Sequence, residues 1–137
     1  MSMGDGDDEA ASDPTSRRVL VIDDEALVRR TVQTILRRRG IDSVAAEGGR
    51  EGVEIYEREW QLIDRVILDM RMPDMTGGEV LGALRRINPD AVVLVVSGYS
   101  EAQVLEELGE APTGVILKPF TARSLLEKLR ETSDAPL

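Results

Sequence analysis

Five polar side chains with complementary chemistry follow apolar stretches of this 137-residue sequence. They are Asp23, Asp24, Asp69, Ser97 and Lys118. Carboxylates can hold a hard, oxygen-bound cation such as Mg²⁺, and a carboxylate can also act as a nucleophile. A lysine ammonium and a serine hydroxyl can neutralise the oxygens of a phosphoryl group during its transfer. If the fold brings these five residues together, their chemistry suits phosphoryl transfer.

The stretches that carry these residues belong to an alternating pattern of strands and helices. Runs rich in Val, Ile and Leu predict strands over residues 18–23, 43–46, 65–69, 91–97 and 113–118. Amphipathic spacing predicts helices over residues 25–39, 50–60, 77–87, 100–109 and 121–130. Strict alternation predicts an α/β fold with a doubly wound, five-stranded parallel sheet in the order 2-1-3-4-5. Helices cover both faces of this sheet in a flavodoxin-like, three-layer arrangement.

The first and fourth predicted helices are anchored to different degrees. Asp24 is expected to cap the helix over 25–39, and Gly40 is expected to end it. The helix over 100–109 has few apolar positions and is expected to be the least well anchored. The side chains expected to face the core are Leu27, Val28, Val32, Ile35 and Leu36 in the first helix, and Val104, Leu105 and Leu108 in the fourth.

The predicted sheet places the polar residues at one edge. Strands 1, 3, 4 and 5 are neighbours in the order 2-1-3-4-5, and open α/β sheets bind ligands at the carboxyl ends of their strands. Asp23, Asp24 and Asp69 would repel one another there unless a cation lies between them, and Mg²⁺ fits this need. An oxygen of Asp69 is then free to attack phosphorus, while Lys118 and Ser97 neutralise the phosphoryl group.

Composition narrows the function further. The chain has no cysteine and no histidine, which excludes disulfides, thiolate or imidazole metal sites and triads built on either residue. Residues 1–16 hold five acids and no base, and the rest of the chain holds 21 acids and 17 bases. This mildly acidic body argues against nucleic acid as a partner, and the absence of a long apolar run argues against membrane contact. We expect a cytoplasmic protein with an acidic disordered tail or linker over 1–16, one domain over 17–131 and a short C-terminal tail over 132–137.

A set of short motifs resembles the receiver domain of two-component response regulators. The motifs are Asp23-Asp24, Asp69 followed by Met72-Pro73, Ser97-Gly98 and Lys118-Pro119. Each motif alone is common, because paired aspartates usually cap helices and Ser-Gly usually forms a turn. Together they occur in the order and spacing of the family, and the resemblance covers about residues 17–131.

The resemblance implies a role for each matching position. Asp69 would accept a phosphoryl group from a phosphohistidine of a sensor histidine kinase or a phosphotransfer protein. Mg²⁺ would be bound by Asp69, directly by Asp24, through water by Asp23, and by the backbone carbonyl of Arg71. The domain would catalyse its own phosphorylation from phosphodonors and its own slow dephosphorylation, without being a turnover enzyme.

The resemblance also predicts how the phosphoryl group is sensed. Lys118 would pair with the phosphate, Ser97 would donate a hydrogen bond to it after activation, and the bond before Pro119 would be cis. Many family members carry an aromatic residue where this chain has Val115. Tyr99 either substitutes for that ring and screens the phosphate, or is a loop tyrosine with a solvated hydroxyl. We expect the change to pass through the helix over 100–109 and the elements that follow it.

Other functions and arrangements remain open from the sequence. One alternative is a docking domain that works without phosphorylation, and another is a small phosphatase of the haloacid dehalogenase type. The latter family places its nucleophile in an Asp-x-Asp motif, whereas the first strand here ends in adjacent aspartates. The segment 97–101 resembles the C-terminal receivers of hybrid sensor histidine kinases, with a stand-alone regulator as the second choice. A homodimer would use the face formed by the fourth helix, the fifth strand and the fifth helix.

Overall fold

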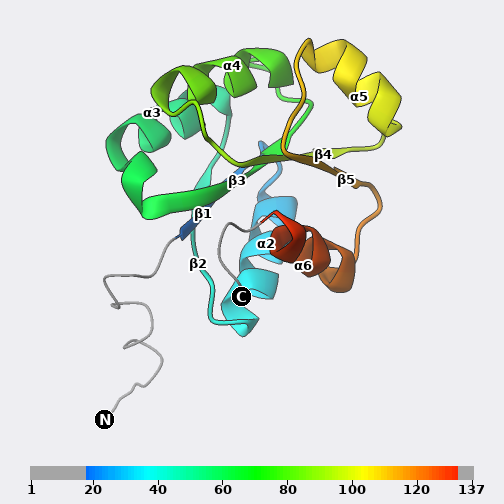
Figure 1. Ribbon diagram of the computed structural model, residues 1–137. Helices are drawn as coiled ribbons and strands as arrows, with labels where there is room; N and C mark the ends of the chain where they lie inside the picture. The colour runs from blue at the N-terminus through cyan, green and yellow to red at the C-terminus, as the bar shows by residue number, and fades with distance from the viewer. Residues whose placement is uncertain (1–17, 133–137) are drawn as a thin grey trace.

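The computed structural model describes residues 18–132, which form one parallel sheet flanked by helices (Figure 1). The five strands lie in the order β2-β1-β3-β4-β5 and all pairs are parallel, which confirms the predicted fold class. The predicted tail over 1–16, and all of the predicted tail over 132–137 except residue 132, lie outside the described residues. The elements are β1 (Arg18–Ile22), α2 (Ala26–Arg38), β2 (Asp42–Ala46), α3 (Gly49–Glu59), the 3₁₀ turn η1 (Trp60–Leu62), β3 (Ile63–Asp69), α4 (Gly77–Ile87), β4 (Val93–Ser97), α5 (Glu101–Leu108), β5 (Gly114–Leu117) and α6 (Ala122–Glu131).

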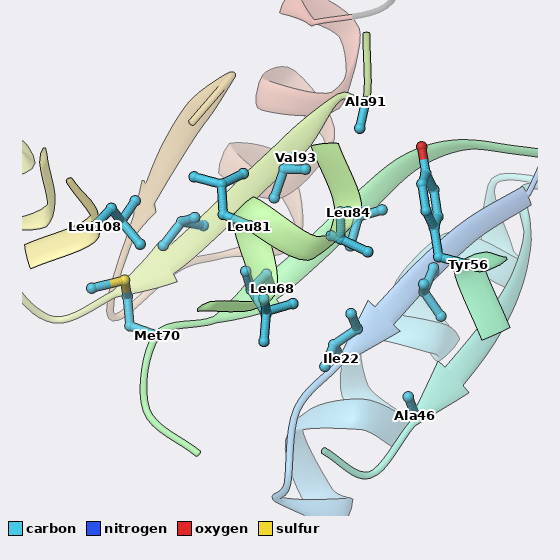
Figure 2. Close-up of a cluster of buried hydrophobic side chains, with 14 of the residues drawn as sticks. Ile22, Ala46, Tyr56, Leu68, Met70, Leu81, Leu84, Ala91, Val93 and Leu108 are labelled. Atoms are coloured by element: carbon cyan, nitrogen blue, oxygen red, sulfur yellow. The ribbon is translucent and has the colours of Figure 1, made fainter. Parts of the chain in front are cut away.

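The helices divide into two layers, and each layer covers its own hydrophobic core. Helices α3, α4 and α5 lie on one face of the sheet, and α2 and α6 lie on the other (Figure 1). Because successive side chains of a strand point to opposite faces, β1 sends Leu20 and Ile22 into the first core and Val19 and Val21 into the second. The first core extends from Tyr56 to side chains near α5, as Figure 2 shows. Burial on both faces makes the central strands a rigid base for the residues at their ends.

The start of α2 differs from the prediction. Asp24 is exposed and does not cap the helix, which begins at Ala26 after Glu25. Instead, the backbone N–H of Glu25 donates to Oδ1 of Asp23 at 2.9 Å. The buried aspartate makes this local bond because its short side chain reaches the backbone two residues ahead. One Asp23 oxygen is therefore fixed in place beside the sheet edge.

Two leucines expected in the core are exposed. Leu27 is 73% exposed because it lies five and nine residues from Val32 and Leu36, which places it on the opposite side of α2 from these buried residues. Leu105 is 46% exposed, and the buried residues of α5 are Val104 and Leu108, one turn apart. Helix α5 is therefore anchored weakly, as the sequence predicted, and by two buried side chains rather than the predicted three.

Two strands, β3 and β4, begin two residues away from their predicted starts, whereas the starts of β2 and β5 differ by one residue. Strand β3 starts two residues earlier, at Ile63, because η1 turns this side chain into the core, where it is 4% exposed. Strand β4 starts two residues later, at Val93, because the preceding turn is closed by Asn88. The backbone N–H groups of Asp90 and Ala91 donate to the side-chain and backbone oxygens of Asn88 at 3.1 and 2.9 Å.

Helix α3 approaches its neighbours closely through glycines. A Cβ atom on Gly52 would lie 2.4 Å from Cδ1 of Ile22, so only glycine lets α3 lie this close to β1. At the start of α3, the N–H groups of Arg50 and Gly49 donate to the Asp74 carboxylate at 2.9 and 3.0 Å. These bonds hold the pKa of Asp74 below its usual value. They also fasten the loop that follows Asp69 to the body of the domain.

A buried arginine joins β3 to α6. Arg65 is a charged residue of β3 and is only 5% exposed. Its Nη1 donates to the backbone carbonyl of Leu129, and its Nη2 lies 3.2 Å from an Asp64 carboxylate oxygen. A cation at the carboxyl end of a helix is favourable because the last carbonyls carry partial negative charge. Arg65 therefore fixes the end of α6 against the amino-terminal half of β3.

Candidate functional site

Three carboxylates meet at the carboxyl edge of the sheet, as predicted. Strands β1 and β3 are neighbours with Ile22 opposite Leu68, so the next residues, Asp23 and Asp69, emerge side by side. Together with Asp24 they each offer one oxygen, and these oxygens all lie within 4.8 Å of one another. Asp23 is 3% exposed and Asp69 is 4% exposed, whereas Asp24 faces solvent. The group is thus a partly enclosed acidic pocket.

The pocket disfavours negative charge in the absence of a cation. Burial raises the pKa of Asp23 to about 6, and the neighbouring charges of Asp69 and Asp24 act in the same direction. Burial also raises the pKa of Asp69, although the charge of Lys118 and the N–H of Arg71 oppose this rise. Crowded carboxylates with raised pKa values are typical of sites that bind a cation.

Lys118 lies beside Asp69, also as predicted. Its Nζ is 3.3 Å from Oδ1 of Asp69, and its side chain is 37% exposed. The backbone N–H of Lys118 donates to the Ser97 carbonyl at 2.8 Å, which continues the pairing of β5 with β4 beyond the last strand residue. The peptide bond between Lys118 and Pro119 is cis, in agreement with the resemblance. The ammonium group is therefore held at the pocket while still open to solvent.

Ser97 and Tyr99 line a hollow of about 290 Å³ that also touches Asp69 and Lys118. Ser97 is 3% exposed, and its Oγ accepts the backbone N–H of Tyr99 at 2.9 Å. The guanidinium carbon of Arg71 lies 4.7 Å from the centre of the Tyr99 ring, close enough for a cation–π contact. The sequence drew attention to Arg71 and Tyr99 separately, but nothing in their spacing indicated that the two side chains stack on each other.

Tyr99 packs against the core that contains Val115, the position at which many receiver domains carry an aromatic residue. Val115 is 8% exposed and belongs to the first core, and Tyr99 is a partly buried side chain packed against that same core. Tyr99 is therefore more than a solvated loop tyrosine, because it packs against the core and its ring also contacts Arg71. It forms a wall of the hollow next to Asp69.

The donor set of the acidic pocket fits Mg²⁺. The three clustered groups are carboxylates, the hard oxygen ligands that this ion prefers. Two of them are buried and one is exposed, so an ion can be held by protein oxygens and still keep water ligands. Arg71, the fourth predicted contributor, follows Asp69 by two residues and its N–H already bonds the Asp69 carboxylate.

Residues 19–130 match the family model of the response regulator receiver domain. The chain belongs to this family. Receiver domains are signalling domains of two-component systems rather than enzymes that turn over a metabolite. The match covers all five strands except Arg18, and includes each of the pocket residues.

Relatives of this receiver domain occur in proteins of very different length. The sensor kinase CckA of Brucella abortus (strain 2308) is 35% identical over 117 residues, which are 85% of this chain and 12% of that protein. The chemotaxis protein CheY of Thermotoga maritima is 32% identical over 119 residues, which are 85% of this chain and 98% of that protein. The family therefore appears both as one part of a kinase and as nearly the whole of a small protein.

A solved structure of a relative carries ligands. TrrA from Thermotoga maritima, a response regulator protein, was crystallised in complex with Mg²⁺ and BeF. It is 30% identical, with a TM-score of 0.75, and the match covers 85% of this chain and 98% of that chain.

Within residues 18–132 of the present receiver domain, no helix has the length and apolar character needed to cross a membrane.

Proposed function

We propose that Asp69 accepts a phosphoryl group from the phosphohistidine of a sensor histidine kinase or a phosphotransfer protein. The observation that supports this most strongly is the pairing of the buried Asp69 carboxylate with the Lys118 ammonium at 3.3 Å, inside a cluster of three carboxylates. Asp69 ends the central strand β3, and its neighbours in the pocket come from separate strand ends. The proposal includes a cytoplasmic location, where a kinase would have access to ATP.

Each residue of the pocket has a part in the transfer. An Asp69 oxygen attacks phosphorus, the bond from phosphorus to the imidazole nitrogen of the donor breaks, and the imidazole leaves with its bonding electron pair. The Lys118 ammonium moves from Asp69 to the transferred group and neutralises a phosphoryl oxygen. The Ser97 hydroxyl, now bonded to the Tyr99 N–H, turns to donate to another phosphoryl oxygen. The product is an acyl phosphate on Asp69.

The metal belongs to the same proposal. Asp24 and Asp69 would bind Mg²⁺ directly, Asp23 would bind it through water, and the Arg71 carbonyl would complete the protein ligands. When bound, the ion supplies positive charge that offsets the carboxylates and the phosphoryl oxygens. Asp23 is suited to the outer position because one of its oxygens already accepts the Glu25 N–H at 2.9 Å.

The acceptor is tested by intact-mass measurement after incubation with acetyl phosphate and Mg²⁺. The wild-type chain should gain the mass of one phosphoryl group, and Asp69→Asn should gain none, because an amide cannot form the acyl phosphate. Asp64→Asn is the control, since Asp64 also lies on β3 but outside the pocket, and it should still be modified. An unmodified wild type, or an equal adduct on Asp69→Asn, would refute the proposal.

The Arg71–Tyr99 stack should slow the loss of the phosphoryl group by covering the hollow beside Asp69. A cation–π contact of this kind contributes up to about 1 kcal/mol, so we expect Tyr99→Ala to speed hydrolysis about two- to fivefold. Tyr99→Phe keeps the ring and should hydrolyse at the wild-type rate. The rate is followed by the decay of the phosphorylated mass after the phosphodonor is removed. Equal rates in all three proteins would show that the ring does not screen the site.

The signal would leave the pocket through Ser97, α5 and β5. Phosphate would draw the Ser97 hydroxyl inward, release the Tyr99 N–H and bias the loop before α5 toward a second conformation. The narrow anchorage of α5 by Val104 and Leu108 supports this route. Leu105 and Leu117 are 46% and 47% exposed on α5 and β5, which supports a contact surface there. The homodimer through the α5–β5–α6 face stays a prediction.

A further inference from the structure

We propose that the acidic residues 1–16 of this chain bind a basic groove between α2 and α6. Residues 1–16 lie outside the described part of the structure, and the groove lies on the face of the sheet opposite α3, α4 and α5 (Figure 1). The contact is intramolecular: the leader, residues 1–16, covers one face of its own receiver domain. The proposal is independent of phosphorylation at Asp69.

The groove combines an apolar floor with basic walls. Its volume is about 570 Å³, and its floor is formed by Ile35 of α2 and Leu126 of α6, both only partly buried against the second core. Four of the side chains that line it are arginines: Arg38, Arg39, Arg123 and Arg130. The one acid among the lining residues is Glu127, whose Oε2 is 4.0 Å from Nε of Arg123.

Three of the four arginines of the groove lack nearby acids, and the leader has acids but no bases. Within residues 18–132, Arg38, Arg39 and Arg130 have no carboxylate oxygen within 4.0 Å. Unpaired guanidinium groups facing one groove are unexpected in a chain with a formal charge of −9. The leader holds Asp5, Asp7, Asp8, Glu9 and Asp13 and no Lys or Arg. Opposite charges on the two segments favour their association.

The point at which the leader joins the domain lies next to both walls of the groove. Arg18, the first residue of β1, pairs with Asp42 of β2, which follows Arg39 by three residues. On its other side, Val19 pairs with Arg65, which is bonded to the Leu129 carbonyl just before Arg130. Both arginine-bearing helix ends are therefore beside the start of β1. Seventeen residues extend up to roughly 60 Å, ample to reach along a groove that begins there.

Because the leader is covalently attached to the domain, weak charge contacts are sufficient to hold it in the groove. A short connection holds the leader at an effective concentration on the order of millimolar near the groove. Each exposed ion pair contributes little and is screened by salt, so the contact should form at low ionic strength and weaken as salt rises. The leader of a second copy would use the same charges, and the experiment distinguishes that contact from the intramolecular one.

The test places a nitroxide spin label on the leader and measures amide signals in the 137-residue chain. Because the sequence has no cysteine, Ser12→Cys gives one labelling position. At low salt, amides of residues 34–39 and 122–130 should lose most of their intensity, and high salt should restore them. The triple variant Arg38→Gln/Arg39→Gln/Arg130→Gln should restore them at low salt.

The matched control removes the same charge from the other face. Arg50→Gln/Arg58→Gln/Arg86→Gln changes arginines of α3 and α4 and should leave the broadening of the groove unchanged. Broadening limited to residues next to Arg18, or broadening that persists in the groove variant, would contradict the proposal. A further sample mixes isotope-labelled protein that has no spin label with spin-labelled protein. Broadening of the groove signals in this mixture alone would show contact with a second copy and would overturn the intramolecular proposal.

Discussion

Asp23→Asn is expected to stabilise the metal-free domain while weakening its binding of Mg²⁺. Asp23 is 3% exposed, and its charged form is opposed by burial and by two neighbouring carboxylates. A pKa raised from 3.8 to about 6 corresponds to about 3 kcal/mol, and we expect about 2 kcal/mol to remain because water reaches the pocket edge. Asparagine keeps the oxygen that accepts the Glu25 N–H, so this helix-start bond is preserved.

The sign of this effect depends on pH. Between its unfolded pKa of 3.8 and its folded pKa of about 6, Asp23 binds more proton in the native state than in the unfolded state. The stability contributed by this group is therefore full below pH 3.8 and is lost as the pH rises through about 6. The asparagine variant does not titrate, so its advantage should be absent near about pH 4 and complete near about pH 8.

Urea unfolding with EDTA or with Mg²⁺ at both pH values measures the effect. With EDTA at the higher pH, Asp23→Asn should have the larger free energy of unfolding. Saturating Mg²⁺ should stabilise the wild type by mass action and narrow or reverse the difference. If the variant is less stable than the wild type in EDTA at the higher pH, the charged form of Asp23 does not destabilise the metal-free domain, and the prediction is wrong.

Gly52→Ala is expected to destabilise the domain although alanine favours helices. The added Cβ would lie 2.4 Å from Cδ1 and 2.7 Å from Cγ1 of the fully buried Ile22. Overpacking of this kind costs about 1–3 kcal/mol, while the helix propensity of alanine returns up to about 1 kcal/mol. The net loss in the free energy of unfolding should be about 1–2 kcal/mol. Thermal and urea unfolding at constant pH provide the measurement.

A matched glycine and a rescue variant isolate the steric cause. Gly82 lies in the interior of α4, and the nearest atom to its added Cβ would be Nη1 of the flexible Arg86 side chain at 3.6 Å. Gly82→Ala should therefore stabilise the domain by up to about 1 kcal/mol. Ile22→Val removes the clashing methyl group and should recover part of the stability of Gly52→Ala. Equal effects of the two glycine changes would exclude a close contact between α3 and β1.

The strand order and the meeting of Asp23, Asp69 and Lys118 could be predicted because they follow from simple rules. Alternating strands and helices favour a parallel sheet, and parallel strands bring their carboxyl ends to one edge. Residues at those ends must then converge, whichever side-chain rotamers they adopt. The resemblance to receiver domains added the role of the Arg71 carbonyl, which the spacing alone does not provide.

Details that depend on side-chain direction could not be predicted. Asp23 and Asp24 have the same chemistry, and only the geometry of the turn decides that Asp23 bonds the start of α2. The guanidinium of Arg65 donates to the carbonyl of Leu129, 64 residues away, and nothing in the local sequence indicates this contact. The Arg71–Tyr99 contact likewise joins two loops that follow different strands.

The most direct test of the central claim identifies the residue that carries the phosphoryl group. The wild-type chain is phosphorylated with acetyl phosphate and Mg²⁺, then treated with borohydride, which reduces an aspartyl phosphate to homoserine and leaves free carboxylates intact. Peptide mass spectrometry locates the change. We predict homoserine at residue 69 and unchanged aspartate at 23 and 24. Homoserine at either of the other two positions, or at none of the three, would contradict Asp69 as the acceptor.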